Sequence, residues 1–320
     1  MDLIGMILWP IKWVVELLLV GWHWLFTALG MDEGAGITWV LAIVGLTVVI
    51  RAALIPIFVK QIKNQRRMLE VAPELKKIQA KYKGKKDQFS RQEMSRETME
   101  LYKKTGTNPL SSCLPLLLQM PIFFSLFSVL NDAQHGKPGV GPLNAALGAQ
   151  FGQASLFGAP LHQSFSGAMN HEGGPQVLVM VIAAVMVVLM TASQFITQLQ
   201  IVSKNMSAET KASPQFRQQR ILLYILPFVF LFSGFAFPLG VMFYWLTSNI
   251  WTMGQQFVVI RNMPTPGSDA AKAREARLAR RGKLVAEDGS VVVTLDEPRK
   301  TQREQPMSKA RAKKKGKNQK

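Results

Sequence analysis

Five long apolar runs divide the sequence, and each is long enough to cross about 30 Å of hydrocarbon as an α-helix. The runs cover residues 37–59, 109–131, 176–198, 219–238 and 240–260. None of them alternates polar and apolar residues, so we predict helices rather than the strands of a barrel. Pro238, Leu239 and Gly240 join the last two runs as a tight hairpin. The pattern predicts an all-α integral membrane protein with a five-transmembrane-helix core.

The start of the chain has a different pattern. Within residues 1–30, the polar residues Lys12, Glu16, His23 and Thr27 fall on one face at helical spacing, and tryptophans are concentrated around them. Tryptophan prefers the headgroup level of a membrane. We therefore predict an outer interfacial amphipathic helix. A sixth span is the alternative, because length does not separate a helix that lies on a membrane from one that crosses it.

Residues 60–107 are polar, with apolar positions recurring at helical spacing on both sides of a break at residues 83–88. This predicts two helices joined by a turn, with Pro73 kinking the first. A connector between two spans needs only a few residues, so the length indicates a cytoplasmic helical hairpin. The remaining connections are an extracytoplasmic loop (132–175), a cytoplasmic loop (199–218) and a basic, mostly disordered tail (261–320), in which residues 270–283 have helix-forming character.

Charge placement predicts the orientation. Of the 38 Lys and Arg residues, 14 lie in residues 60–107, 4 in 199–220 and 17 in 261–320, whereas the 132–175 loop holds only Lys137. The positive-inside rule puts the three basic segments in the cytoplasm and that loop outside. We therefore expect a multi-pass protein of the plasma membrane with its N-terminus outside and its C-terminus inside. No cleavable signal peptide is expected at the start.

Composition argues against most catalytic chemistry. The single cysteine, Cys113, excludes an intrachain disulfide and is interpreted as a small packing residue. The four histidines fall on the outer side, and no zinc-protease motif, intramembrane acid pair or Ser/His/Asp set accompanies them. We expect no metal, no cofactor and no enzyme activity. The net charge of +18 favours polyanionic surfaces, without sequence-specific nucleic-acid recognition.

Arg51 is the most informative residue. It lies three positions past the midpoint of the first run, and none of the five runs contains an Asp or Glu. An arginine near the centre of a bilayer costs about 2.5–3.5 kcal/mol on insertion-derived scales. Without an acidic partner in the membrane, water or a ligand must satisfy it. Snorkelling to the inner headgroups is the alternative, although that surface is roughly 12 Å away at the helical rise.

The other polar residues of the runs gather toward the cytoplasmic half. Thr47 precedes Arg51 by one turn on the same face. The remaining candidates lie at the centre or the inner half of the second, third and fifth runs: Gln119, Gln194, Gln198, Tyr244, Trp245, Asn249 and Gln255. Each could instead hold two helices together, at roughly 0.6 kcal/mol per hydrogen bond. Together they predict a substrate-binding groove that is open below and closed above.

At this point a family resemblance rests on three motifs. The first is Thr47-Val48-Val49-Ile50-Arg51-Ala52-Ala53-Leu54-Ile55-Pro56. The second runs from Met99 to Lys103 and then from Asn108 to Phe123, and includes Pro115, Gln119 and Pro121. The third runs from Pro238 to Asn249 and is followed by Gln255 and Gln256. In this order, with a charged hairpin between the first two, they resemble the YidC/Oxa-type membrane protein insertases, and the chain looks like an actinobacterial member.

The resemblance implies a five-helix core with a groove open to the cytoplasm and to lipid. Arg51 matches the groove arginine of the family, Thr47 the polar residue one turn earlier, and Trp245, next to Tyr244, the aromatic groove position. Gln194 or Gln198 matches the glutamine of the third span. The implied partners are nascent membrane proteins, the Sec translocase through the hairpin, and the ribosome through the basic tail. From charge alone, the tail suits ribosomal RNA or anionic lipids.

The residues and the resemblance predict an insertase or chaperone for integral membrane proteins, working alone or with the Sec translocase. Arg51 would attract acidic residues of an incoming segment, because a hydrated groove of lower dielectric strengthens that attraction and shortens the apolar layer. A transporter or channel for an anionic solute is the main rival. The sequence contains no repeated half and no polar outer vestibule that would support it.

Overall fold

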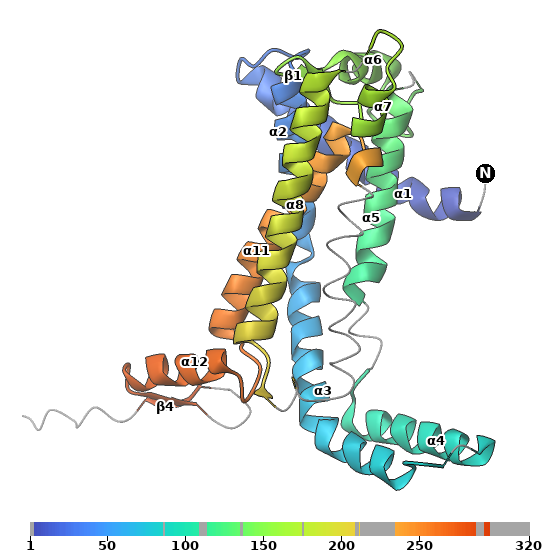
Figure 1. Ribbon diagram of the computed structural model, residues 1–320. Helices are drawn as coiled ribbons and strands as arrows, with labels where there is room; N and C mark the ends of the chain where they lie inside the picture. The colour runs from blue at the N-terminus through green and yellow to red at the C-terminus, as the bar shows by residue number, and fades with distance from the viewer. Residues whose placement is uncertain are drawn as a thin grey trace, which may run out of the picture.

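The computed structural model describes residues 3–85, 87–108, 114–134, 137–174, 176–208, 211, 234–285 and 291–294. Helices dominate this part of the chain, and apolar runs form their contact faces. The long helices are α1 (Leu3–Ala28), α2 (Gly36–Ala53), α3 (Ile55–Lys81), α4 (Gln88–Thr105), α5 (Leu114–Gln134), α8 (Val177–Lys204) and α11 (Leu239–Asn262). Figure 1 shows α2, α5, α8 and α11 as an upright bundle, in which α11 packs against both α2 and α8.

Four of the five expected spans correspond to described helices. Residues 37–59 fall on α2 and the first turn of α3, 114–131 on α5, 176–198 on α8, and 240–260 on α11. Residues 109–113, which include Cys113, lie outside the described residues. The expected span at 219–238 lies outside the described residues, apart from positions 234–238, where a short 3-10 helix, η2 (Gly234–Ala236), precedes α11.

Three helices in the described ranges are long and apolar enough to cross a membrane: Gly5–Ala28, Gly36–Ala53 and Val177–Lys204. The two other helices of the bundle, α5 and α11, are 21 and 24 residues long, which exceeds the minimum length for a span. Polar side chains lower the hydropathy of α11. The described part of the chain is thus mainly helical, and several of its helices have the length and composition of membrane spans.

The hairpin segment forms two helices below the bundle (Figure 1). A single residue, Leu54, separates the end of α2 from the start of α3. Helix α3 contains Pro73 and continues out of the bundle. Asp87 caps α4 by accepting a hydrogen bond from the Ser90 N–H at 2.7 Å, which lowers the pKa of the Asp87 carboxyl. Glu97 of α4 accepts hydrogen bonds from Lys81 and Tyr82 at the end of α3. These contacts tie the two arms together near their turn.

The 132–175 loop is folded over the upper end of the bundle (Figure 1). It contains α6 (Ala145–Gln153), α7 (Phe165–Met169) and a two-stranded antiparallel pair, β1 (Ser155–Leu156) and β2 (Ala159–Pro160). Phe151 of α6 enters the main core, where it meets the edge of Trp39 at 5.4 Å. The loop is therefore a cap with a core shared with the helices, rather than a free connector.

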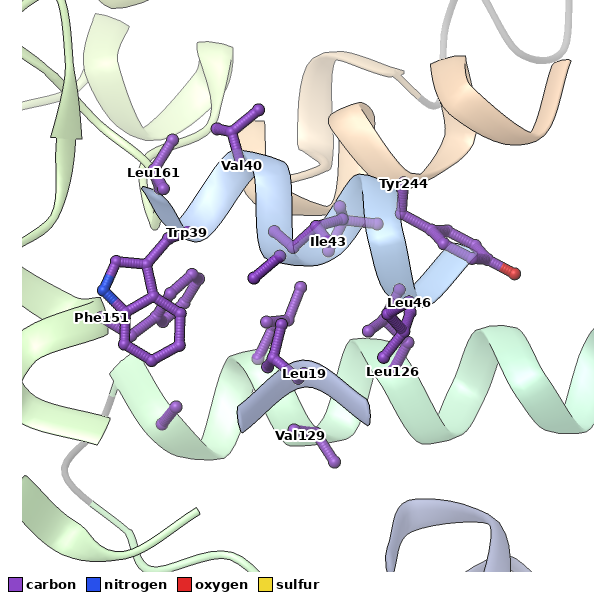
Figure 2. Packing of buried hydrophobic residues seen from close by; sticks show 14 of the residues in the cluster. Leu19, Trp39, Val40, Ile43, Leu46, Leu126, Val129, Phe151, Leu161 and Tyr244 are labelled. Atoms are coloured by element: carbon purple, nitrogen blue, oxygen red, sulfur yellow. The ribbon is translucent and has the colours of Figure 1, made fainter. Parts of the chain in front are cut away.

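The main core lies in the upper half of the bundle. Leu19 of α1, Ile43 and Leu46 of α2, and Leu126 of α5 are completely buried. Figure 2 shows Leu19 among side chains of α2 and α5, with Tyr244 of α11 at the edge of the cluster. This end of the bundle is filled with apolar side chains, which agrees with the expectation that polarity decreases in this direction.

The first part of the tail is also folded. Helix α12 (Asp269–Ala279) is followed by the antiparallel strands β3 (Lys283–Val285) and β4 (Val291–Thr294). The N–H of Thr265 donates to Oδ1 of Asn205, at 2.8 Å, which attaches this unit to the end of α8. The expected helix at 270–283 is thus shorter than predicted, and the strand pair was not anticipated. The tail beyond 294 lies outside the described residues.

Helix α1 differs most from its expectation. It crosses the upper bundle obliquely and packs against α2 and α5 (Figure 1). Its polar face is turned into the protein: Glu16 is 1% exposed and His23 is 3% exposed. Large apolar side chains, including Trp9, Val14 and Trp24, are exposed instead. The polar face of α1 is thus in contact with the rest of the protein. The capping loop, for example, supplies hydrogen-bond donors to Glu16.

Candidate functional site

The candidate site begins at the last turn of α2, where Arg51 lies. Arg51 is partly exposed, and it forms no salt bridge with any described carboxylate. The four ion pairs of the described ranges are located elsewhere, on α1 and α5 and in the hairpin. The apolar runs contain no acidic residue, and no described acid from elsewhere in the chain forms a salt bridge with Arg51 either.

Tyr244 of α11 is the polar neighbour of Arg51. The two side chains lie within electrostatic range of each other across the packed faces of α2 and α11. Nε2 of Gln119, from α5, donates a hydrogen bond to Oη of Tyr244 at 2.5 Å. Three helices that are distant in sequence thus contribute one polar residue each to the same region. Tyr244 is only 3% exposed, so this region lies against the buried core rather than on the surface.

Two of the expected groove residues have roles inside the protein. Thr47 is 1% exposed, and its hydroxyl donates to the Ile43 carbonyl one turn earlier, at 2.6 Å. Such a bond to its own helix satisfies the hydroxyl without a ligand. Asn249 is 6% exposed, and its Nδ2 donates to the Met190 carbonyl of α8 at 3.4 Å. The structure thus places Thr47 in the α2 packing surface and Asn249 between α11 and α8.

Trp245 belongs to an aromatic cluster. Its ring meets that of Phe123 of α5 edge-on, with centroids 5.3 Å apart, and lies 5.5 Å from the ring of Phe237. Edge-to-face pairs of this kind contribute about 0.5–1.5 kcal/mol beyond their buried area. Trp245 is partly exposed, and this cluster links α5 to α11.

The glutamines near the lower end are more dispersed. Gln194 and Gln198 are half-buried on α8, and in the described part of the chain neither forms a hydrogen bond with Arg51, Gln119 or Tyr244. Gln255 accepts a hydrogen bond from Nε1 of Trp251 on its own helix at 3.1 Å. The structure therefore joins Arg51, Gln119 and Tyr244, with Trp245 beside them, and does not join the other candidates to them.

A separate gap near the upper end has no room for a water molecule, and Arg51 is not among its lining residues. Phe127, Leu130 and Phe151 line it, together with the polar residues Asn131 and His162. This gap is too small to receive a client. The polar residues around Tyr244 remain the better candidate for substrate contact.

Comparison with known proteins assigns the family. Residues 30–266 match the family described as the 60Kd inner membrane protein. The chain is 46% identical over 316 residues to the membrane protein insertase YidC of Tropheryma whipplei strain Twist, covering 98% of this chain and 97% of that protein. The chain belongs to the YidC/Oxa family of membrane protein insertases. The resemblance based on the three motifs is therefore confirmed.

Further members of the family match across most of the chain. The membrane protein insertase YidC of Streptomyces avermitilis is 46% identical over 273 residues, covering 84% of this chain and 61% of that protein. That of Bifidobacterium longum is 34% identical over 325 residues, covering 96% of this chain and 95% of the relative. The family match includes α2, α5, α8 and α11, and hence all the helices that contribute to the Arg51 region.

One buried charge was missed by sequence reasoning. Glu16 was assigned to the polar face of an interfacial amphipathic helix, yet it is among the most buried polar residues of the described chain. A single acid in an otherwise apolar helix is a signal of the same kind as Arg51, because a charge in such a position requires a partner. Its partner was not recognisable, since it consists of backbone groups in a loop.

Proposed function

We propose that this protein inserts nascent integral membrane proteins and assists their folding, through a hydrated groove that opens to the cytoplasm. The observation that carries the proposal is Arg51, a cation on an apolar helix with no described acidic partner, beside the Gln119–Tyr244 pair. Family membership supports insertion as the activity, since the relatives are named membrane protein insertases.

The proposed mechanism is electrostatic and involves no bond cleavage. A hydrated groove halfway through the bilayer shortens the apolar layer that a polar flanking segment must cross, and so lowers its desolvation cost. Arg51 attracts acidic residues in that segment, and the attraction exceeds its strength in bulk water because the surroundings have a lower dielectric. The apolar part of the client then moves along α2, α5 and α11 into lipid. Trp245 offers it an aromatic contact.

The proposed orientation places the upper cap outside and the hairpin and α12 in the cytoplasm. It rests on the excess of Lys and Arg in the segments at the lower end of the bundle. In this arrangement the N-terminus is outside and the C-terminus is inside. The filled core under the cap would close the groove on the outer side, whereas Arg51, Gln119 and the lower glutamines would face the side from which clients arrive.

We assign partners by position and charge. The hairpin of α3 and α4 extends away from the bundle, which suits the recruitment of clients and contact with the Sec translocase. The basic residues of α12 and of the tail suit ribosomal RNA or anionic lipid headgroups, both of which would bind in a salt-dependent manner. The nucleic-acid contacts would involve phosphates and no base-specific recognition.

The test is insertion of a small, Sec-independent client into liposomes that contain only this protein. Arg51→Ala is expected to reduce insertion of a client with acidic residues in its translocated segment by about tenfold, the effect of losing one charge-assisted hydrogen bond. A client whose translocated segment is neutral should be affected little, and Arg51→Lys should retain most of the activity. Equal loss for both clients would contradict the electrostatic role, and solute uptake or ion currents would favour a transporter.

A further inference from the structure

Glu16 of α1 forms a second charged site, distant from Arg51. Its Oε1 accepts a hydrogen bond from the Val140 N–H at 2.8 Å, and its Oε2 accepts one from the Gly141 N–H at 2.7 Å. The Leu143 N–H adds a third at 3.4 Å. Because the side chain is 1% exposed, these backbone groups replace water as its hydrogen-bond partners. A carboxylate in a concave array of backbone N–H groups is a stable arrangement for a buried anion.

The loop is shaped to fit this carboxylate. A Cβ at Gly139 would lie 2.5 Å from Cδ of Glu16, and one at Gly141 would lie 2.8 Å from Cδ1 of Trp13. Real Cβ atoms do not approach other atoms this closely, so only glycine lets the loop backbone come near enough to donate. Two glycines and one acid, more than 120 residues apart in sequence, therefore form one interlocking contact.

No described cation forms a salt bridge with Glu16. Lys12, one turn earlier on α1, is paired with Asp132 of α5, at 3.8 Å, with both side chains partly exposed. The Glu16 contact is thus a bond between α1 and a loop, and the Lys12 pair is a weaker bond between α1 and α5. Ion pairs that remain partly in contact with water contribute little, so Glu16 provides the stronger attachment.

The residues next to Glu16 show what the attachment holds in place. Val15 and Leu19 are 1% and 0% exposed and belong to the main core with Leu46 and Leu126. Figure 2 shows Leu19 filling the space between α2 and α5. The outward face of α1 is apolar, so no polar contact on that side holds the helix down. If α1 moved away from the loop, the core above Tyr244 would lose its cover.

We propose that Glu16 is a positioning residue that fastens α1 to the capping loop and so closes the outer end of the groove. The carboxylate holds Val15 and Leu19 against α2 and α5, and those side chains keep the outer half of the bundle dry. The groove is then open on one side only, which lets a client be inserted without a leak. This inference rests on the proposed orientation, and its test distinguishes the two.

The test uses a reporter cysteine in the core below α1. Leu46→Cys, introduced in the full chain together with Cys113→Ser, is expected to be protected from a membrane-impermeant maleimide added to the outer side of proteoliposomes. Glu16→Gln should raise its labelling rate from that side by at least about tenfold, since losing a charge-assisted hydrogen bond shifts a local opening equilibrium by about that factor. Gly139→Ala, which displaces the loop from the carboxylate, should have the same effect.

Two controls distinguish a fastening role from general destabilisation. Lys12→Gln removes a neighbouring charge on the same helix and should leave the reporter protected. In the Glu16→Gln protein, a second reporter, Ala183→Cys, should remain protected, because Ala183 is completely buried in a separate core cluster that contains no residue of α1. Misfolding would expose both reporters.

Two outcomes would overturn the proposal. Continued protection of the reporter in both Glu16→Gln and Gly139→Ala would show that the carboxylate does not hold α1 closed. Labelling from the cytoplasmic side alone would place the opening at the wrong end, and would contradict the proposed orientation as well. Client insertion is measured in the same liposomes, so that failure of the fastening role can be told from failure of the proposed function. An unmodified protein that inserts no client refutes the proposed function, whereas the labelling result for Glu16 is unaffected.

Discussion

Two charged residues on apolar helices, Glu16 and Arg51, are treated in opposite ways by the fold. Glu16 is 1% exposed and accepts hydrogen bonds from three backbone N–H groups of the capping loop. Arg51 is partly exposed and has Tyr244, a neutral residue, as its polar neighbour, with no described acid in salt-bridge contact. Backbone groups of the protein satisfy Glu16, whereas no described acid pairs with Arg51, which the proposed function assigns to the incoming client.

Under the proposed function, the difference separates a structural charge, Glu16, from a functional one, Arg51. A buried charge is costly unless hydrogen bonds or an opposite charge compensate it. For Glu16 the compensation is complete, so removing the charge should harm stability. For Arg51 the compensation is incomplete, so removing the charge should harm activity without lowering stability. The predictions below test this contrast, in order of decreasing expected effect.

The largest effect on stability is expected for Glu16→Gln. The substitution replaces one acceptor oxygen with an NH2 group that faces the backbone N–H donors of the loop. We expect the protein in detergent to lose about 2 kcal/mol of unfolding free energy, the order of one hydrogen bond to a charged group. Thermal unfolding, compared with Lys12→Gln as the matched control, measures it. An unchanged unfolding temperature would show that the hydrogen bonds of Glu16 do not contribute to the stability of the protein.

Arg51→Gln should act in the opposite direction. Because the cation is not paired with an acid, its removal relieves a desolvation cost and is expected to stabilise the protein by roughly 1 kcal/mol, while reducing insertion of acidic clients. The same unfolding assay measures this, with Arg51→Lys as the control that keeps the charge. A destabilisation comparable to that of Glu16→Gln would mean that Arg51 has a structural partner after all.

An effect no larger than that of Arg51→Gln is expected for the Gln119–Tyr244 hydrogen bond beside Arg51. Tyr244→Phe and Gln119→Leu should each destabilise the protein by about 1 kcal/mol, and a double-mutant cycle should return a coupling of similar size. The cycle is measured by unfolding of the four proteins in the same detergent. Additive single effects would show that α5 and α11 are held together by packing around Trp245 and Phe123, without help from this bond.

The smallest effect is expected for the solvent-exposed ion pair between Lys81 and Glu97 in the hairpin. The hydrogen bond from Lys81, followed by that from Tyr82, lowers the pKa of Glu97, and the bond to Glu97 raises the pKa of Lys81. The contribution of Glu97 is therefore present above the ordinary carboxyl pKa and is lost as the pH falls through its lowered value. Glu97→Gln should leave global unfolding unchanged and slightly speed amide hydrogen exchange at the α3–α4 turn near neutral pH. Equal exchange rates in Glu97→Gln and in the unmodified protein would show that this contact does not stabilise the hairpin.

Much of the fold was predictable because apolar runs are a strong signal. A helix needs about 20 residues to cross hydrocarbon, and the runs containing α2, α5, α8 and α11 are each about that long. Only helices and closed barrels satisfy the backbone in lipid, so helices were the clear prediction. The folded cap was not predictable, because α6, α7 and the β1–β2 pair depend on contacts with distant residues such as Trp39. The break between α2 and α3 also escaped prediction, since both sides of Leu54 have helical character.

At Arg51 the candidate site stays a prediction, and the structure revises some of the residues expected around it. A charge without an acid partner is visible in a sequence, whereas the partner of a hydroxyl or amide is not. Thr47 and Asn249 were expected in the groove, and the structure gives them bonds to the Ile43 and Met190 carbonyls. Backbone carbonyls have no sequence signature, so a polar residue that binds one cannot be told from a residue that faces a ligand.

The most direct test of the central claim is whether position 51 is wet from one side. Arg51→Cys, in a chain that also carries Cys113→Ser, is treated with a membrane-impermeant thiol reagent from each side of the membrane, with Leu46→Cys as the buried control. We predict rapid modification of position 51 from the cytoplasmic side, none from the outer side, and none for Leu46→Cys from either. A position 51 that is unreactive from the cytoplasm, or equally reactive from both sides, would contradict a hydrated groove closed at its outer end.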